Sequence, residues 1–307
     1  MQSSLRVGAL LAVGAFALLA ESAHALNIVA TYDSSITGLS NSAAVQANIN
    51  SAVAFYNAKF SNNITVRITF TNQTSGLGGS SSNFTNVSYS SVRTALLNSS
   101  SSADDATAYA ASLPASSPIG TTGTVDINTA NARAIGLLGN SATSDGQIFL
   151  NTGICFTTHT SPVAGKYDLY AVACHEIDEV LGTVSNLDFT TATPCTADFF
   201  RYSSNGVRAF NNNTAVHAYF SVNGGASNVV EYNHFNHAPG DWGDWITHSP
   251  EQVQDYAGSP GVTVDPGNSE FKLLDVVGYT LAPVPEPTSM VALGLGVVAF
   301  VRRRRSK

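Results

Sequence analysis

The chain has 307 residues, of which 44% are hydrophobic and only 11% are charged. This apolar content is enough for a sizeable core, so the low charge does not indicate disorder. The net charge of −7 argues against nucleic acid as a partner. We therefore expect an ordered protein whose polar surface consists mainly of Ser, Thr and Asn, a composition common in exported proteins.

Residues 1–25 have the parts of a signal peptide. Arg6 precedes an apolar run over residues 7–20, and Ala23-His24-Ala25 offers a small-x-small cleavage site. The apolar run is short for a membrane span. We expect a cleaved signal peptide, with Leu26 as the first mature residue; the alternative is an uncleaved membrane anchor.

Residues 284–307 form a second targeting segment. A Pro-Glu-Pro sequence at 285–287 precedes an apolar stretch over 290–301 and four arginines at 302–305. This order resembles the PEP-CTERM sorting signal of Gram-negative bacteria. The resemblance implies export to the periplasm, the cell envelope or the extracellular space. It also implies transient anchoring in the inner membrane, with the arginines inside, and cleavage near Pro-Glu-Pro by an exosortase. A permanent C-terminal anchor is the alternative.

Between these ends, residues 26–283 are predicted to form the folded domain, beginning with alternating strand and helix patterns. Strands are predicted at 27–32, 63–72 and 145–151, helices at 42–60, 90–98 and 103–113, and a Gly/Ser loop at 76–82. A further helix is predicted at 168–184. Short strands at 199–202 and 218–222, a turn at 223–225 and a helix at 269–277 follow. This order predicts an α+β fold with a looser C-terminal subdomain.

The helix at 168–184 carries the residues with the clearest chemical pattern. His175 and Glu179 are four residues apart, so they lie one turn apart on the same helix face. A His and a carboxylate in this arrangement are workable zinc ligands. Glu176 lies beside them and would hold a metal-bound water. Gly182 allows the helix to end and the chain to turn sharply.

This motif resembles the His-Glu-x-x-His motif of zinc metallopeptidases, especially the metzincins. Two positions depart from it, because Glu179 replaces the second His and Ser185 occupies the place of the third. The metzincin Met-turn is absent, since Met1 and Met290 are the only methionines. The strand Gln147–Asn151 stands where metzincins place the edge strand that binds the substrate backbone.

A closer resemblance is to a family of exported bacterial zinc metalloproteases with a His-Glu-x-x-Glu motif. The matching segments are residues 175–182, 198–203, 218–225, 240–245 and 274–279. The resemblance implies a zincin-like α+β fold, with a twisted mixed sheet and an active-site helix. It places an acid before Phe-Phe-Arg-Tyr, which makes Asp198 the expected third metal ligand after His175 and Glu179. Asp188 is the alternative, and Zn²⁺ is the expected cofactor, with manganese or iron as alternatives.

A second polar cluster consists of His234, His237, Asp241 and Asp244, interleaved with aromatic residues. It could be a substrate rim, an oxyanion donor or a second metal site. The alternative is a loop that is packed by its aromatic residues. Tyr202 is a candidate donor to the transition state.

Three cysteines remain in the exported domain, where a disulfide is permitted. Cys174 falls inside the predicted helix, so Cys155–Cys195, between two loops, is the expected pair.

The function expected from these features is secreted, metal-dependent endopeptidase activity at the cell envelope or in the extracellular matrix, with a protein or peptide as substrate. A metal-activated water would hydrolyse the peptide bond, with Glu176 as the general base. The alternative is a non-catalytic surface or matrix protein on a degenerate zincin scaffold.

Overall fold

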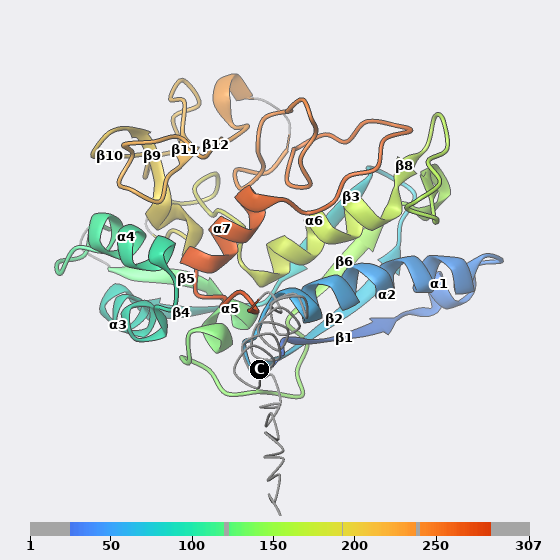
Figure 1. Cartoon of the computed structure of the whole chain (residues 1–307), viewed down its shortest axis with the longest axis horizontal. Coiled ribbons are helices and arrows are strands. Elements are labelled where there is room, and N and C mark those ends of the chain that lie inside the picture. The colour runs from blue at the N-terminus through green and yellow to red at the C-terminus, as the bar shows by residue number, and fades with distance from the viewer. Residues whose placement is uncertain (1–24, 120–122, 192, 238–239, 284–307) are drawn as a thin grey trace, which may run out of the picture.

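The computed structural model describes residues 25–119, 123–191, 193–237 and 240–283. The predicted PEP-CTERM tail (284–307) and all of the predicted signal peptide except Ala25 lie outside these residues. In the described part of the chain, no helix has the length and hydropathy needed to cross a bilayer. The fold is α+β with several small sheets, as expected (Figure 1).

The larger sheet has the strand order β1-β2-β6-β3. Its strands are β1 (Asn27–Tyr32), β2 (Thr65–Asn72), β6 (Gly146–Leu150) and β3 (Gly78–Ser82). The first three pair in parallel, and β3 pairs antiparallel with β6. In β2, Val66, Ile68 and Phe70 are buried and alternate with partly exposed residues, as the alternating apolar pattern predicted. The three parallel strands confirm the predicted ones.

The Gly/Ser segment 76–82 differs from its prediction, because residues 78–82 form the edge strand β3. Gly and Ser have little preference for strands, so the backbone ladder with β6, from Gly78↔Leu150 to Ser82↔Gly146, defines this strand. Strand β6 therefore lies between β2 and β3. The prediction that Gln147–Asn151 is the edge strand is wrong, and β3 has that place.

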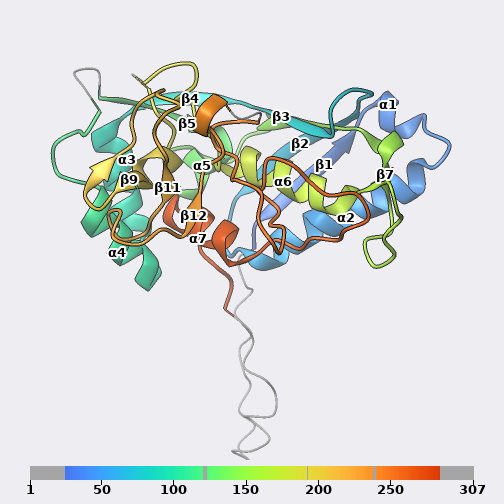
Figure 2. The same ribbon diagram turned by 90° about the horizontal axis from the view of Figure 1, so that it is seen from above.

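Two long helices pack beside this sheet, α2 (Ser42–Lys59) and α6 (Leu169–Leu181), and both were predicted. Figure 2 shows the sheet on one side of these two helices. Helix α6 begins where Asp168 accepts a hydrogen bond from the backbone N–H of Tyr170. It ends at Gly182, whose φ of 136° is a conformation that other residues rarely adopt.

The remaining elements are shorter. The helices are α1 (Ser34–Thr37), α3 (Tyr89–Ser99), α4 (Ala103–Ser112), α5 (Thr129–Ala134) and α7 (Asn268–Val276). Two small pairs are β4 (Phe84–Ser88) with β5 (Thr124–Asn128), and β7 (Cys155–Phe156) with β8 (Tyr167–Asp168). The helices predicted at 90–98, 103–113 and 269–277 correspond to α3, α4 and α7.

The C-terminal subdomain contains a second sheet with the order β10-β9-β11-β12. Its strands are β9 (Arg201–Ser204), β10 (Val207–Arg208), β11 (Tyr219–Phe220) and β12 (Val230–Glu231). The described residues also include the 3₁₀ turns η2 (Ala197–Phe200) and η3 (Phe235–His237) in this subdomain, and η1 (Thr152–Ile154) after β6. The strand predicted at 199–202 thus begins only at Arg201. An irregular segment, residues 240–265, then runs along α6 before the chain enters α7 (Figures 1 and 2).

The predicted Cys155–Cys195 disulfide is absent. All three cysteines, Cys155, Cys174 and Cys195, are unpaired, and all are buried. Cys155 lies in β7, beside the start of α6. Cys195 lies before η2, where its N–H donates to Asp198. The two thiols are therefore packed in different parts of the core, where burial raises the pKa of each.

Candidate metal centre

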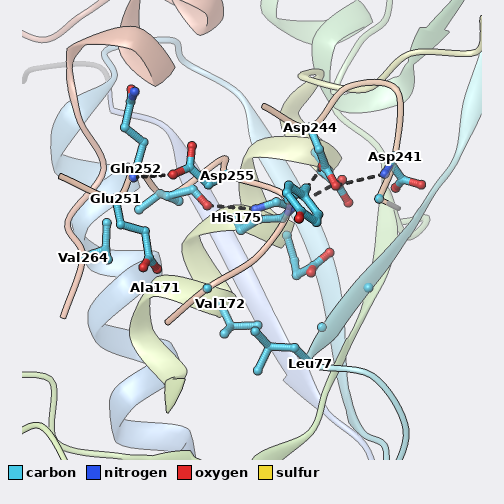
Figure 3. Close-up of a pocket in the computed structure, with 18 residues that line it drawn as sticks. Leu77, Ala171, Val172, His175, Asp241, Asp244, Glu251, Gln252, Asp255 and Val264 are labelled. Atoms are coloured by element: carbon cyan, nitrogen blue, oxygen red, sulfur yellow. Dashed lines mark hydrogen bonds and ion pairs between the residues drawn. The ribbon is translucent and has the colours of Figure 1, made fainter. Parts of the chain in front are cut away.

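Helix α6 directs three of its side chains toward one pocket. His175, Glu176 and Glu179 all line a cavity of about 280 Å³. Its walls come from the start of β3, from α6 and from the irregular segment 240–265 (Figure 3). The predicted helical spacing therefore places the three residues together, as expected from the sequence.

The irregular segment adds a third acid, Asp244. His175 Nε2 lies 3.3 Å from Asp244 Oδ1 and 3.7 Å from Glu179 Oε1. One ligand atom from each of these three residues lies within 4.8 Å of the other two. Figure 3 shows the side chains of His175 and Asp244 directed toward each other. The structure thus groups one imidazole with two carboxylates.

Hydrogen bonds hold each of these side chains by its other polar atom. His175 Nδ1–H donates to the carbonyl of Val253 at 2.8 Å, which leaves Nε2 directed into the group. Glu179 Oε2 accepts from Ser80 Oγ at 2.7 Å. Asp244 Oδ2 accepts from the backbone N–H of Asp241 at 2.9 Å. Outer contacts of this kind orient the ligands of metal centres.

Unpartnered oxygens at this site indicate that a cation fits. Glu176 Oε2 is buried and has no hydrogen-bond partner, and Asp244 Oδ1 is buried with only the ion pair to His175 Nε2. Leaving carboxyl oxygens buried with so few partners costs free energy, which a bound cation would offset. One imidazole and two carboxylates suit Zn²⁺ and also Mn²⁺ or Fe²⁺. The residues that are present therefore fit a divalent cation.

The acids also shift one another's titration. Burial, and then the negative charge of Glu179, raise the pKa of Glu176 well above its ordinary value. The same two causes raise the pKa of Asp241 to about 7. Burial opposes ionisation of Glu179 as well, but hydrogen bonds from His175 and Ser80 outweigh it and lower the pKa of Glu179. The carboxyl groups of the pocket therefore disfavour one another's ionisation, and a bound positive ion would relieve that repulsion.

Asp198 does not join this group, which corrects the predicted third ligand. Its Oδ1 accepts from Ser185 Oγ at 2.7 Å, and its Oδ2 accepts from the backbone N–H of Cys195 at 2.9 Å. Asp198 thus fixes the turn before η2. The alternative, Asp188, also lies outside the group, and its Oδ1 accepts from the backbone N–H of Phe189.

The second polar cluster is divided between two roles. Asp241 and Asp244 line the pocket, whereas His234 packs behind it. His234 Nδ1 accepts from Arg201 Nη2 at 2.7 Å, and its Nε2–H donates to the carbonyl of Val216 at 2.9 Å. Both ring nitrogens are used, so His234 is not a ligand of a second metal.

Arg201 links this packing to the group of His175, Glu179 and Asp244. Its guanidinium is buried, lies over the ring of Tyr232 and donates to the carbonyl of Trp242 at 2.7 Å. Trp242 in turn stacks on the ring of His234. Since Trp242 is two residues before Asp244, these contacts hold the loop that carries the third acid.

Tyr202 is not at the pocket, so its predicted role as a transition-state donor is wrong. It lies in β9, and its hydroxyl donates to Ser112 Oγ at 2.9 Å in the core. Tyr256 is the tyrosine that lines the pocket.

The buried His234 predicts a pH-dependent stability. Burial and the nearby charge of Arg201 lower the pKa of His234 to about 3, whereas an unfolded histidine titrates at about 6.5. Between these values only the unfolded chain binds the proton, so stability is lost as the pH falls. The loss is at most about 1.4 kcal/mol per pH unit.

His234→Gln should remove this dependence. Urea denaturation with EDTA, at about pH 7 and about pH 5, measures the unfolding free energies of the variant and the parent. The difference between the two proteins should be smaller at the lower pH. An unchanged difference would show that His234 titrates alike in the folded and unfolded chains.

A glycine controls the approach of the Asp244 loop to the end of α6. A Cβ on Gly243 would lie 2.5 Å from the carbonyl oxygen of Thr183 and 3.2 Å from the Cα of Val184. Both are backbone atoms, so the loop itself would have to move. Gly243→Ala should therefore cost about 1–3 kcal/mol and weaken metal binding.

The matched control is Gly79→Ala. It is also in the pocket wall, but its Cβ would meet nothing within 4 Å. Chemical denaturation and zinc competition would measure both variants. Equal affinities for zinc in the two variants would contradict a role for this close approach in positioning Asp244.

The comparisons with known proteins bear on the C-terminal tail and not on the candidate metal centre. Residues 283–305 match the PEP-CTERM protein-sorting motif. Searches of curated proteins and of solved structures found no match. The tail therefore identifies the chain as an exported protein that is sorted to the cell envelope and processed by an exosortase.

Proposed function

We propose that this exported protein is a metal-dependent endopeptidase. The observation that carries the proposal is the convergence of His175, Glu179 and Asp244, with Glu176 beside them, in one pocket. Three residues would hold a divalent cation, with Zn²⁺ as the first candidate. The fourth is a carboxylate of raised pKa, which suits a group that exchanges protons.

A bound cation would polarise the scissile carbonyl and lower the pKa of water in the site. Glu176 would take the proton from the attacking water and pass it to the leaving amine. The unpartnered Oε2 of Glu176 is available for this transfer. His175, Glu179 and Asp244 would keep their positions throughout, because each is held by a second hydrogen bond.

The edge strand β3 supports a peptide as the substrate. Within the described sheet, β3 pairs with β6 along one edge, and no described strand pairs with its other edge. An extended peptide can add to such an edge through backbone hydrogen bonds. Gly78 and Gly79 begin this strand and line the pocket, so a peptide paired there would pass beside Glu176.

Gly78 in this wall leaves no room for a side chain. A Cβ there would collide with Glu176 Oε1 and would lie 2.7 Å from Val172 Cγ1. The absence of a side chain lets the strand approach α6 at the position of the proposed base. This close approach supports the placement of a substrate backbone along β3.

Metal analysis and proteolysis together test the proposal. The purified exported protein should contain about one divalent ion per chain, and it should cleave casein or gelatin until a chelator removes that ion. Protein without bound metal, even after incubation with Zn²⁺, would overturn the proposal. Bound metal without cleavage of any peptide in a random library would instead indicate a non-catalytic envelope protein.

A further inference from the structure

The side chain of Gln254 contacts His175, one of the three proposed metal ligands, but has no role in the proposed reaction. It is fully buried on the irregular segment 240–265. Its Nε2 lies 3.4 Å from His175 Nε2, whereas its Oε1 is buried and has no hydrogen-bond partner. A buried amide with an unpartnered oxygen is costly unless that oxygen has a further use.

The distance of this amide from His175 matches the spacing between ligands of a metal ion. Ligand atoms about 2.0–2.1 Å from a tetrahedral zinc lie about 3.4 Å from one another. From His175 Nε2, the distances are 3.3 Å to Asp244 Oδ1 and 3.7 Å to Glu179 Oε1. The amide of Gln254, at 3.4 Å, has the same spacing. Its distance from His175 is therefore that expected of a fourth ligand.

The amide can present its oxygen at that place. Without a cation, the amide nitrogen lies 3.4 Å from His175 Nε2, while Nδ1 of the imidazole contacts the carbonyl of Val253. With a cation bound to Nε2, the amide N–H would face a positive ion. Half a turn of the amide about its last bond exchanges the two ends. It would bring Oε1, which has no partner to lose, to the cation.

The backbone of Gln254 is held independently of this rotation. Its carbonyl accepts from the N–H of Trp245 at 2.9 Å, and its N–H donates to Glu270 Oε1 at 3.3 Å. Rotation of the side chain alone can therefore bring the amide to the cation or remove it.

We propose that Gln254 is the fourth protein ligand of the cation and closes its coordination. This inference rests on the proposed metal centre. Catalytic zinc sites keep one position for water or substrate, whereas closed sites fill it with a protein ligand. The Gln254 amide fills that position in the resting protein, and it must turn away before water can enter.

Azide binding to the cobalt-loaded protein tests the closure. Co²⁺ reports its ligands by visible absorption, and azide is a small anion that needs an open position. The parent should show little change with azide, whereas Gln254→Ala should bind azide at least about tenfold more tightly. In competition with a chelator, Gln254→Ala should also lose at least about tenfold in zinc affinity, by analogy with losses at metal sites.

Three further variants complete the design. Gln254→Leu keeps an apolar volume in the same place and should open the site even if the alanine variant folds poorly. Gln254→Glu supplies a carboxylate oxygen and should keep the site closed to azide. Gln252→Ala, on the same segment and in the pocket wall, is the control that should behave as the parent.

The outcomes separate this inference from the peptidase proposal. Equal azide affinity in the parent and in both opened variants would overturn the fourth ligand while leaving the metal centre intact. A closed, cobalt-binding parent that cleaves no peptide would support the fourth ligand and count against the peptidase. A parent that binds neither Co²⁺ nor Zn²⁺ would overturn both.

Discussion

Glu176→Gln should abolish peptide hydrolysis while leaving the metal bound. Glutamine has the size of glutamate but no basic carboxylate, so it cannot accept the proton of the attacking water. The loss in kcat/KM should be at least about a hundredfold, the usual contribution of a general base. Zinc content is measured on the same preparation, because the proposed ligands are His175, Glu179 and Asp244.

The control for this experiment is Glu251→Gln. Glu251 also lines the pocket, but both of its carboxylate oxygens accept from the N–H of Ser259. Its replacement should leave the rate within a few fold of the parent. Suppose instead that Glu176→Gln lost the metal, while Glu179→Ala kept it. The roles of base and ligand assigned to this helix would then be exchanged.

The local part of the site could be predicted from the sequence because a helix fixes its own geometry. His175 and Glu179 are four residues apart, and the buried face of α6 follows from the apolar residues around them. The start at Asp168 and the end at Gly182 follow from capping preferences. The structure confirms this helix and the placement of both side chains in one pocket.

The edge of the sheet could not be predicted in this way. Strand β3 consists only of Gly and Ser, so no apolar alternation marks it. It becomes a strand because β6 offers it a backbone ladder, and its small residues let it approach α6. Strand β6, with its apolar residues, was predicted as the edge strand, but it pairs with β2 on one side and with β3 on the other.

The third acid was missed because its position depends on contacts between distant segments. Asp244 lies far along the chain from α6, and no spacing rule connects them. It is brought to His175 by the loop that Arg201 and His234 hold. Asp198 comes sooner after the helix, but Ser185 and Cys195 already engage both of its oxygens. The sequence showed Asp241 and Asp244 as part of a polar cluster, but it did not show that Asp244 lies beside His175.

Replacing Asp244 and Asp198 separately distinguishes the third ligand proposed from the structure from the one predicted from the sequence. Asp244→Asn keeps the size of the side chain and an oxygen that can accept from the N–H of Asp241. It loses the negative charge that faces His175 Nε2. Zinc affinity should fall by more than about a hundredfold, beyond the range found for residues that only support a ligand. Unfolding of the metal-free protein should change little.

Asp198→Ala should give the opposite result. The hydroxyl of Ser185 and the N–H of Cys195 would lose their acceptor in the core, at a cost of about 1–3 kcal/mol each. Unfolding in denaturant with EDTA should show this loss, while zinc competition on the folded variant should match the parent. A folded Asp198→Ala protein without zinc affinity, beside an Asp244→Asn protein that binds zinc normally, would restore Asp198 as the ligand. It would also require the 240–265 segment to lie elsewhere when the metal is bound.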